Sequence, residues 1–323
     1  MNKLLKFFRE WGLILAVLII IAAATIIKPV FLSFNNIVNI LQANSTMGIV
    51  SLGLTYVTIG SSMDLAVGST VSLSAVITML IVNATVVGNY SPAYAVFCVI
   101  LAGILIGSAI GLINGAVIAG VNGKLGTGFL VTYGISIIIG ALSLIIAKGK
   151  FQPAKYTAGL FKQLGLGATP VILFVVVAAI LQCLLVYTKF GRHMYFFGAN
   201  MEAARMAGIR TKMMRILSHV ICGACAGLAG VLIVSRVNSA SPVQGAGYEL
   251  DAFVSVSVGG TSLSGGTGSI LKTVLGVLVM GFLLTALNIL GVRSDAQLIV
   301  RGTVIIIAVL LDILNRERAG KGV

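Results

Sequence analysis

The chain has 323 residues, of which 58% are hydrophobic and only 9% are charged, and its formal net charge is +14. An average soluble domain has about 25% charged residues, so this composition excludes a soluble globular protein and indicates that lipid is the main solvent. The basic residues lie mainly at the ends of apolar segments, where they mark membrane topology. We therefore expect no nucleic acid partner.

Apolar segments long enough to cross a bilayer recur along the whole chain. A spanning helix needs about 20 predominantly apolar residues, and the clear and weaker candidates together number about ten. The sequence predicts an all-α polytopic membrane protein with about ten transmembrane or re-entrant helices in one bundle. We expect residues 1–323 to form a single transmembrane domain, because the connections are short. The clear candidates are 12–30, 92–119, 128–147, 170–187, 216–235, 270–291 and 297–314, and the weaker ones are 46–62, 67–87 and 251–266.

The distribution of basic residues predicts the orientation of these spans. Three basic residues, Lys3, Lys6 and Arg9, precede the first apolar segment. The positive-inside rule places such residues in the cytoplasm. Alternation of the spans then puts residues 188–215 and the tail at 316–321 on the same side, so both termini are expected to be cytoplasmic. The basic loop at 148–162 becomes external against the rule, but inverting the chain would expose far more charge.

Asp64 stands just before an apolar run, in the sequence IGSSMDLAVGS. A carboxylate at this place can cap the N–H groups of a starting helix, and a role in a translocation pathway is the alternative. Asp295 and Asp312 lie near span ends. Because a proton-driven carrier would keep an acidic relay well inside a helix, this distribution weakly opposes such a carrier.

Four glycines recur at every fourth position, at Gly103, Gly107, Gly111 and Gly115. On a helix they form one smooth groove, where another backbone can approach closely. The pattern predicts tight helix packing, with a narrow pore face as the alternative. Asn114 lies beside the groove, and an amide within a span more often bonds a neighbouring helix than a substrate.

Residues 188–215 form the only long polar and basic stretch. Asn200 is a favoured helix cap, Glu202 falls in the first turn where negative charge is favoured, and Gly208 can end the helix. Residues 201–207 are therefore predicted to form a helix of about two turns. So short a helix is marginal alone in water, and we expect it to be held either by its own bundle or by a partner.

Residues 251–269 mix apolar residues with glycine and serine. Such backbone is tolerated at membrane depth only when it packs in protein or lines a wet cavity, so we expect this segment inside the bundle, broken or re-entrant. Polar residues there and in the earlier motifs are candidates for lining a translocation pathway. These candidates are Asp64, Asn114, Asp251, Thr261, Ser262 and Ser264.

The sequence contains no motif for nucleotide or metal chemistry. No G-x-x-x-x-G-K-[ST] loop is present, so this polypeptide is not expected to hydrolyse ATP. Cys222 and Cys225 are spaced C-x-x-C but lack a second ligand pair, so we expect buried core residues. His193 and His219 have no acidic residue nearby in sequence, which gives an enzyme poor support. We expect no catalytic residue, no metal and no cofactor bound by this chain.

The segment FGRHMYFFGANMEAARMAGI resembles the cytoplasmic coupling loop of the sugar-type ABC importer permeases, the membrane subunits that serve ribose, xylose, autoinducer-2 and related sugars. Other stretches resemble the same family and occur in its order, so the resemblance spans most of the chain. They are MDLAVGS at 63–69, GLINGAVIAG at 111–120, FLVTYG at 129–134, ELDAFVSVSVGGTSLSGGTGS at 249–269 and the late RGTVIIIAVLLD.

The resemblance implies one half of an import channel in the bacterial cytoplasmic (inner) membrane. It implies a second permease copy or a related permease, cytoplasmic ATPase subunits that bind ATP and Mg, and an external solute-binding protein. ATP-driven closure of the ATPases would move a short helix and reorient the pathway between outward and inward access. Carried over by position, the residues of that ATPase-coupling helix would be Gly198, Asn200, Glu202, Ala203, Ala204, Arg205 and Gly208.

The chain departs from the family pattern at Ser61 and Ser62, where the family usually has two glycines. These hydroxyls can alter local packing or bond a polyol, so the identity of the sugar is not transferred. We expect import of a small sugar. The alternatives are a branched-chain amino-acid ABC permease, an ion-coupled secondary carrier and, more distantly, an intramembrane enzyme. A carrier would work without ATPase partners, and an enzyme would lose turnover when one or two polar residues were replaced.

Overall fold

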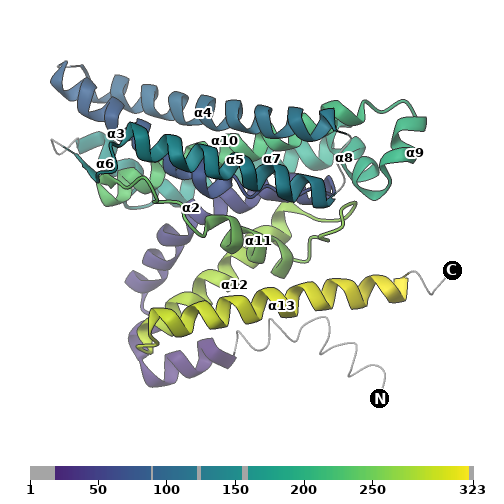
Figure 1. The fold of residues 1–323 in the computed structure, drawn as a ribbon. Helices are drawn as coiled ribbons and strands as arrows, with labels where there is room; N and C mark the ends of the chain where they lie inside the picture. The colour runs from purple at the N-terminus through teal and green to yellow at the C-terminus, as the bar shows by residue number, and fades with distance from the viewer. Residues whose placement is uncertain (1–18, 89, 122–124, 155–158, 320–323) are drawn as a thin grey trace.

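The computed structural model describes residues 19–88, 90–121, 125–154 and 159–319, which are mostly helical (Figure 1). Two short strands, β1 and β2, pair antiparallel. The elements are η1 (Pro29–Leu32), α2 (Phe34–Ile59), α3 (Val67–Val87), α4 (Pro92–Gly120), α5 (Leu125–Ile146), β1 (Gln152–Pro153), α6 (Gly159–Leu164), α7 (Thr169–Tyr187), α8 (Lys189–Ala199), α9 (Met201–Met206), α10 (Thr211–Val237), β2 (Ser239–Ala240), α11 (Tyr248–Val258), α12 (Ile270–Ile289) and α13 (Ser294–Ala319).

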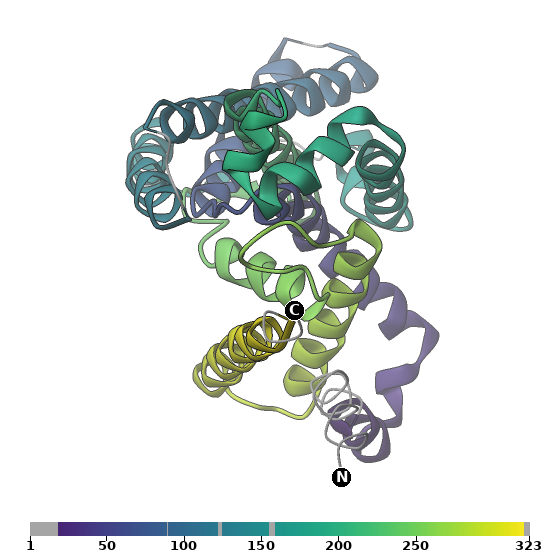
Figure 2. The ribbon, with the colours of Figure 1, turned by 90° about the vertical axis from the view of Figure 1, so that its right-hand side faces the viewer.

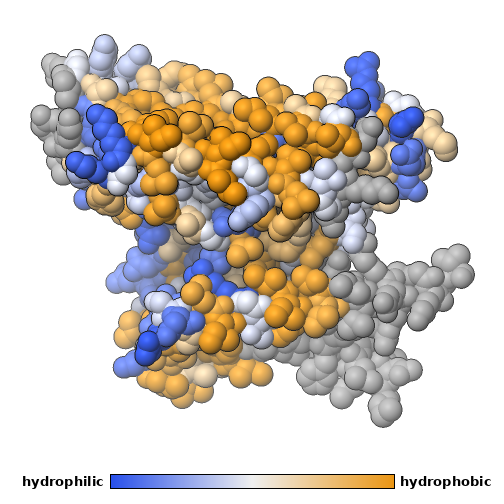
Figure 3. Space-filling view, in the orientation of Figure 1, coloured by the Kyte–Doolittle hydropathy of each residue, from blue (hydrophilic) through white to orange (hydrophobic). Residues whose placement is uncertain are grey.

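The chain is a polytopic α-helical membrane protein. Within the described ranges, seven helices are long and apolar enough to cross a bilayer, namely α2, α3, α4, α5, α7, α10 and α12. Figure 3 shows an apolar band over α4 and α5, with hydrophilic residues at its two ends. The long axes of α4 and α5 therefore run along the direction that crosses the bilayer.

The helix boundaries follow the sequence prediction closely for α3, α4 and α7. The weak candidate at 46–62 was wrong at its start, because α2 begins at Phe34. The hydroxyl of Ser33 caps α2 by accepting the N–H of Asn36 at 3.4 Å. Several amides in the first turns lower the hydropathy without breaking the helix.

Two other predicted spans are changed or only partly visible. The candidate at 12–30 begins outside the described residues, and residues 19–27 are helical. The candidate at 251–266 is broken, as expected: α11 ends at Val258 and residues 259–269 contain no helix. With 11 residues, α11 is about 16 Å long, roughly half the thickness of the hydrocarbon region.

The helices form two groups that α2 connects. Helices α3, α4, α5, α7 and α10 form the larger group, and α11, α12 and α13 form the smaller one (Figures 1 and 2). Helix α2 packs against α10 and α7 in the first group and against α11 and α12 in the second. Tyr56 anchors this central helix, since its buried hydroxyl donates to the carbonyl of Leu181 at 2.6 Å.

The glycine groove of α4 holds the backbone of α10. A Cβ atom built on Gly107 would overlap the carbonyl oxygen of Gly223, and one built on Gly103 would lie 2.9 Å from the carbonyl oxygen of Gly227. Glycines on both helices thus let the two main chains touch. The prediction of tight packing is confirmed, and the alternative of a pore along this face is wrong because α10 fills the groove.

The two ends of the bundle carry different small elements. Helix α6 lies at one end, near the pair in which Gln152 faces Ala240 and Pro153 faces Ser239. Helices α8 and α9 lie at the other end, and α13 also ends on that side (Figure 1). The polar stretch of the sequence therefore projects from one end of an apolar bundle.

Candidate functional site

Helix α9 is the short capped helix that the sequence predicts. The side-chain oxygen of Asn200 accepts the N–H of Ala203 at 3.0 Å, and Glu202 lies in the first turn. Gly208 has a φ of 80°, which side-chain-bearing residues rarely adopt, and its N–H donates to the carbonyl of Arg205 at 3.0 Å. These contacts fix both ends of a six-residue helix.

The two faces of α9 have different environments. Ala204 is fully buried and belongs to the hydrophobic core of this chain. Glu202 and Arg205 are exposed, and Met206 is 83% exposed. Ala204 therefore packs α9 against the bundle, whereas Ala203 is partly exposed and lies nearer the free surface of the helix. Met206 thus leaves a large apolar side chain exposed at the polar end of the bundle.

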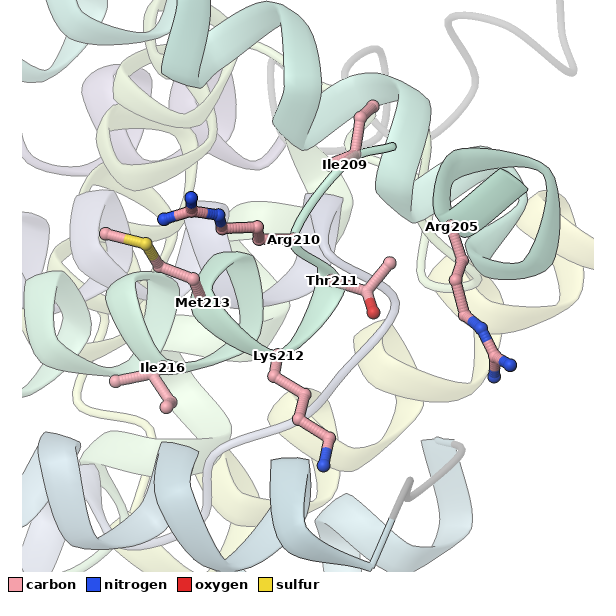
Figure 4. A pocket seen from close by; sticks show the side chains of 7 residues that line it. All are labelled: Arg205, Ile209, Arg210, Thr211, Lys212, Met213 and Ile216. Carbon is pink, nitrogen blue, oxygen red and sulfur yellow. The ribbon is translucent and has the colours of Figure 1, made fainter. Parts of the chain in front are cut away.

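An open pocket of about 550 Å³ lies between α9 and the start of α10 (Figure 4). In Figure 4 the charged ends of Arg205, Arg210 and Lys212 point in different directions, so they do not converge on one small anion. Basic residues therefore stand along the edge of this pocket. Its lining residues are Arg205, Ile209, Arg210, Thr211, Lys212, Met213 and Ile216.

The C-terminal end of α8 packs directly on the end of α2. A Cβ atom built on Gly198 would overlap the carbonyl oxygen of Ile59, so only glycine fits here. The N–H of Gly266 donates to that same carbonyl at 2.8 Å. Helix α8, helix α2 and the 259–269 loop therefore meet at one backbone carbonyl.

A second contact joins α8 to the same loop. The hydroxyl of Tyr195 donates to the carbonyl of Gly268 at 2.8 Å. Burial raises the pKa of this hydroxyl above its ordinary value near 10, so it stays protonated and keeps its proton for the hydrogen bond at neutral pH. The α8–α9 segment (residues 189–206) is thus attached to the 259–269 loop at two points.

Residues 60–66 form a non-helical crossing between α2 and α3, here named the α2–α3 break. Ser61 has a φ of 54°, a left-handed conformation that favours glycine. A Cβ atom on Gly265 would lie 2.6 Å from the Cβ of Ser61, so the break and the 259–269 loop are in close contact. Ser61 therefore occupies a backbone conformation of the kind that glycine usually takes.

Asp64 and Asn114, both pathway candidates, are brought together inside the bundle. The amide of Asn114 donates to both carboxylate oxygens of Asp64, at 3.1 Å each, and the two side chains are 1% and 3% exposed, respectively. Asp64 also accepts the N–H of Ala66 at 2.9 Å, directly before α3 begins. The expected interhelical amide bond of Asn114 is confirmed, whereas the N–H that Asp64 accepts belongs to the residue before α3 and not to the helix itself.

The other pathway candidates lie elsewhere. Asp251 forms an ion pair of 2.8 Å with Arg301, which joins α11 to α13. Thr261 and Ser262 are buried in the 259–269 loop, and Ser264 is exposed. The structure therefore does not gather all the candidates at one place.

Several residues outside the predicted set also hold this region together. The hydroxyl of Thr132 on α5 accepts the N–H of Leu65 in the break at 3.1 Å. Arg215, at the start of α10, bonds backbone carbonyls of the break. The only sequence signal for Arg215 was a positive charge at the edge of a predicted span. This charge was interpreted as a marker of membrane topology.

The remaining reactive side chains form no metal site among the described residues, which contain no suitable group of three or more His, Cys, Asp or Glu. Cys222 and Cys225 are buried free thiols within α10, as expected of core residues. His219 is buried in the same helix, and its Nδ1 lies 2.9 Å from the carbonyl oxygen of Arg215.

Comparison with known proteins gives consistent matches over nearly the whole chain. A family model described as "Branched-chain amino acid transport system / permease component" matches residues 36–309. The ribose import permease protein RbsC of Escherichia coli (strain K12) is 37% identical over 306 residues, which cover 93% of this chain and 92% of that protein. RbsC of Bacillus subtilis (strain 168) is 37% identical over 309 residues, covering 94% and 92%.

A relative with a different named sugar matches over a similar length. The galactose/methyl galactoside import permease protein MglC of Escherichia coli (strain K12) is 31% identical over 331 residues, covering 98% of each chain. No solved structure gives a significant match.

Proposed function

Since this chain belongs to the family of sugar-importing ABC permeases, we propose that it translocates a small sugar delivered by an external solute-binding protein. Separate ATPase subunits, which carry the ATP and Mg, drive the transport. The chain itself performs no covalent chemistry. It works in the bacterial cytoplasmic membrane beside a second permease subunit, either an identical copy or a related chain.

The observation that carries this proposal is the capped helix α9 at the polar end of an apolar bundle. Its exposed face carries Glu202, Arg205 and the 83% exposed Met206, next to an open pocket with basic residues along its edge. A water-exposed methionine has a burial free energy of about 1.5–3 kcal/mol to gain from a partner surface. We assign the ATPase coupling to helix α9 and its flanking residues, 198–208, and this end of the bundle to the cytoplasm.

The pathway in this proposal runs through the interior of one bundle of about ten transmembrane or re-entrant helices. Its polar lining is assigned to Asp64 and Asn114, to Asp251, and to the hydroxyls at 261–264. Half-helix α11 and the α2–α3 break support this assignment, because non-helical backbone at membrane depth is tolerated where protein or a wet cavity surrounds it. Weak polar contacts suit a path in which specificity resides in the binding protein.

The choice of a sugar follows from the relatives. The family description names branched-chain amino acids, whereas the relatives that match over most of their length are named for ribose and galactose. Uptake of radiolabelled ribose, allose, galactose, arabinose and leucine by cells that express the complete system separates these substrates. Uptake of leucine alone would contradict the sugar assignment.

The ATPase contact is tested by co-expression and pull-down with candidate ATPase subunits. Glu202→Ala and Ala203→Arg alter the exposed side of α9 and should lower both the amount of bound ATPase and the uptake. Ala168→Arg introduces an equally bulky cation at the opposite end of the bundle, where Ala168 is exposed, and should leave ATPase binding unchanged. Intact complexes and normal transport in both α9 variants would remove the coupling assignment.

A further inference from the structure

Arg215 is a buried cation near the start of α10. Arg215 is only 5% exposed. Within the described part of the chain, no carboxylate lies within ion-pair distance of its guanidinium. A buried guanidinium that has lost its water needs other partners. The partners that Arg215 has found therefore indicate what it does.

These partners belong to two separate parts of the molecule. One guanidinium nitrogen donates to the carbonyl of Ser61 at 3.3 Å and lies 3.5 Å from the carbonyl oxygen of Gly60. The guanidinium carbon lies 5.1 Å from the ring centre of Phe197, a cation–π distance, and the other terminal nitrogen is 3.7 Å from the sulfur of Met201. One side chain thus contacts both the α8–α9 segment and the α2–α3 break.

The chemistry of arginine suits this place. The carbonyls of Gly60 and Ser61 follow the C-terminal end of α2, where the helix dipole favours a positive charge. The planar fork of a guanidinium can turn one nitrogen to the two carbonyls, the other to Met201 and its face to an aromatic ring at the same time, whereas the ammonium of lysine is a single point on a flexible stem. A lysine at position 215 would keep the charge and lose this geometry.

We infer that Arg215 is a positioning residue that transmits movement of the α8–α9 segment to the α2–α3 break. This inference rests on the proposed function, because it takes α9 as the helix that the ATPases move. A shift of α9 displaces Phe197 and Met201 against the guanidinium, whose hydrogen bonds pull on the break. The break leads within a few residues to Asp64, which Asn114 of α4 holds.

The test uses the complete transporter, with its ATPase subunits and binding protein, in proteoliposomes. For each variant, the amount of ATPase bound, the rate of ATP hydrolysis and the uptake of radiolabelled ribose, allose, galactose and arabinose are measured. The decisive quantity is the number of sugar molecules imported per ATP hydrolysed, since a smaller amount of folded complex does not change this ratio.

Arg215→Lys should lower the ratio about tenfold, as expected for loss of a charge-assisted hydrogen bond, while ATPase binding and hydrolysis persist. Phe197→Leu, which removes only the ring contact, should lower it about threefold. Arg236→Lys is the matched control, because Arg236 lies at the opposite end of the same helix, and it should leave the ratio unchanged.

One result would overturn the inference while leaving the proposed function intact, namely an unchanged ratio in both Arg215→Lys and Phe197→Leu. If uptake and hydrolysis fall together in equal proportion, the ratio is also unchanged, and the role of these residues is then purely structural. A wild-type complex without ATP-dependent uptake of any of the four sugars would instead overturn the proposed function, and this inference with it.

Discussion

Asn114 of α4 donates its amide to both carboxylate oxygens of Asp64, and this pair fixes the α2–α3 break to the larger helix group. Asn114→Ala should lower the free energy of unfolding by about 2–4 kcal/mol, because it leaves a buried carboxylate without its main donor. Chemical unfolding in detergent micelles measures this change. The double variant Asp64→Asn with Asn114→Ala should recover part of the loss, and equal stability of Asn114→Ala and wild type would contradict the prediction.

Gly107→Ala tests the contact between α4 and α10. The added methyl group would overlap the carbonyl oxygen of Gly223, so the free energy of unfolding should fall by about 1–3 kcal/mol. Gly140→Ala on α5 is the matched control, because a Cβ atom there meets no atom within 4 Å. The free energy of unfolding of this control should be unchanged or higher by up to about 1 kcal/mol, because alanine has a higher helix propensity than glycine. Equal thermal unfolding midpoints for the two variants would argue against main-chain contact.

Ser61 and Ser62 are expected to respond differently to glycine. Ser61→Gly relieves a left-handed conformation that costs roughly 1–2 kcal/mol, whereas Ser62 has no positive φ, so glycine there relieves no backbone strain and increases the freedom of the unfolded chain. The free energy of unfolding of Ser61→Gly should therefore exceed that of Ser62→Gly by about 1–2 kcal/mol. Parallel unfolding measurements give the difference, and the reverse order would disprove the strain at Ser61.

Asn200 supports α9 through its cap. Asn200→Ala should destabilise this helix by about 1 kcal/mol and so weaken ATPase binding about fivefold, because the helix must be formed in the complex. Asn200→Asp keeps a side-chain oxygen at this position and should bind nearly as wild type does. Titrated pull-downs compare the affinities. Equal binding by all three chains would mean that the cap is irrelevant to docking.

Local sequence signals predicted the parts of this fold that depend on local physics. Apolar segments gave α3, α4 and α7 nearly to the residue, although the hydroxyl residues of α3 made it a weaker candidate. The cap at Asn200 with the stop at Gly208 gave α9. The glycine spacing of α4 predicted a close neighbour. It did not identify α10 as that neighbour, because a repeat on one helix carries no information about the other helix.

The candidate site was less predictable, since it depends on contacts between distant segments. Asp64 and Asn114 were each recognised from their own surroundings, yet nothing in either segment indicates that they bond each other. Arg215 looked like a topology signal, because its buried partners are backbone carbonyls and an aromatic ring from other elements. The start of α2 was missed because the amides of its first turns lower the hydropathy, although Asn36 donates its amide to the carbonyl of Phe31 at 2.6 Å.

The carbonyl of Ile59 touches main chain on both sides, from Gly198 and from the N–H of Gly266. Side chains can absorb a small push by changing rotamer, but bare backbone has no such freedom. Movement of α8 against α2 would therefore be transmitted through this junction with little relaxation by side chains. Mutations that tune the transport rate would then have to lie at other positions, because any atom added at Gly198 would separate α8 from α2.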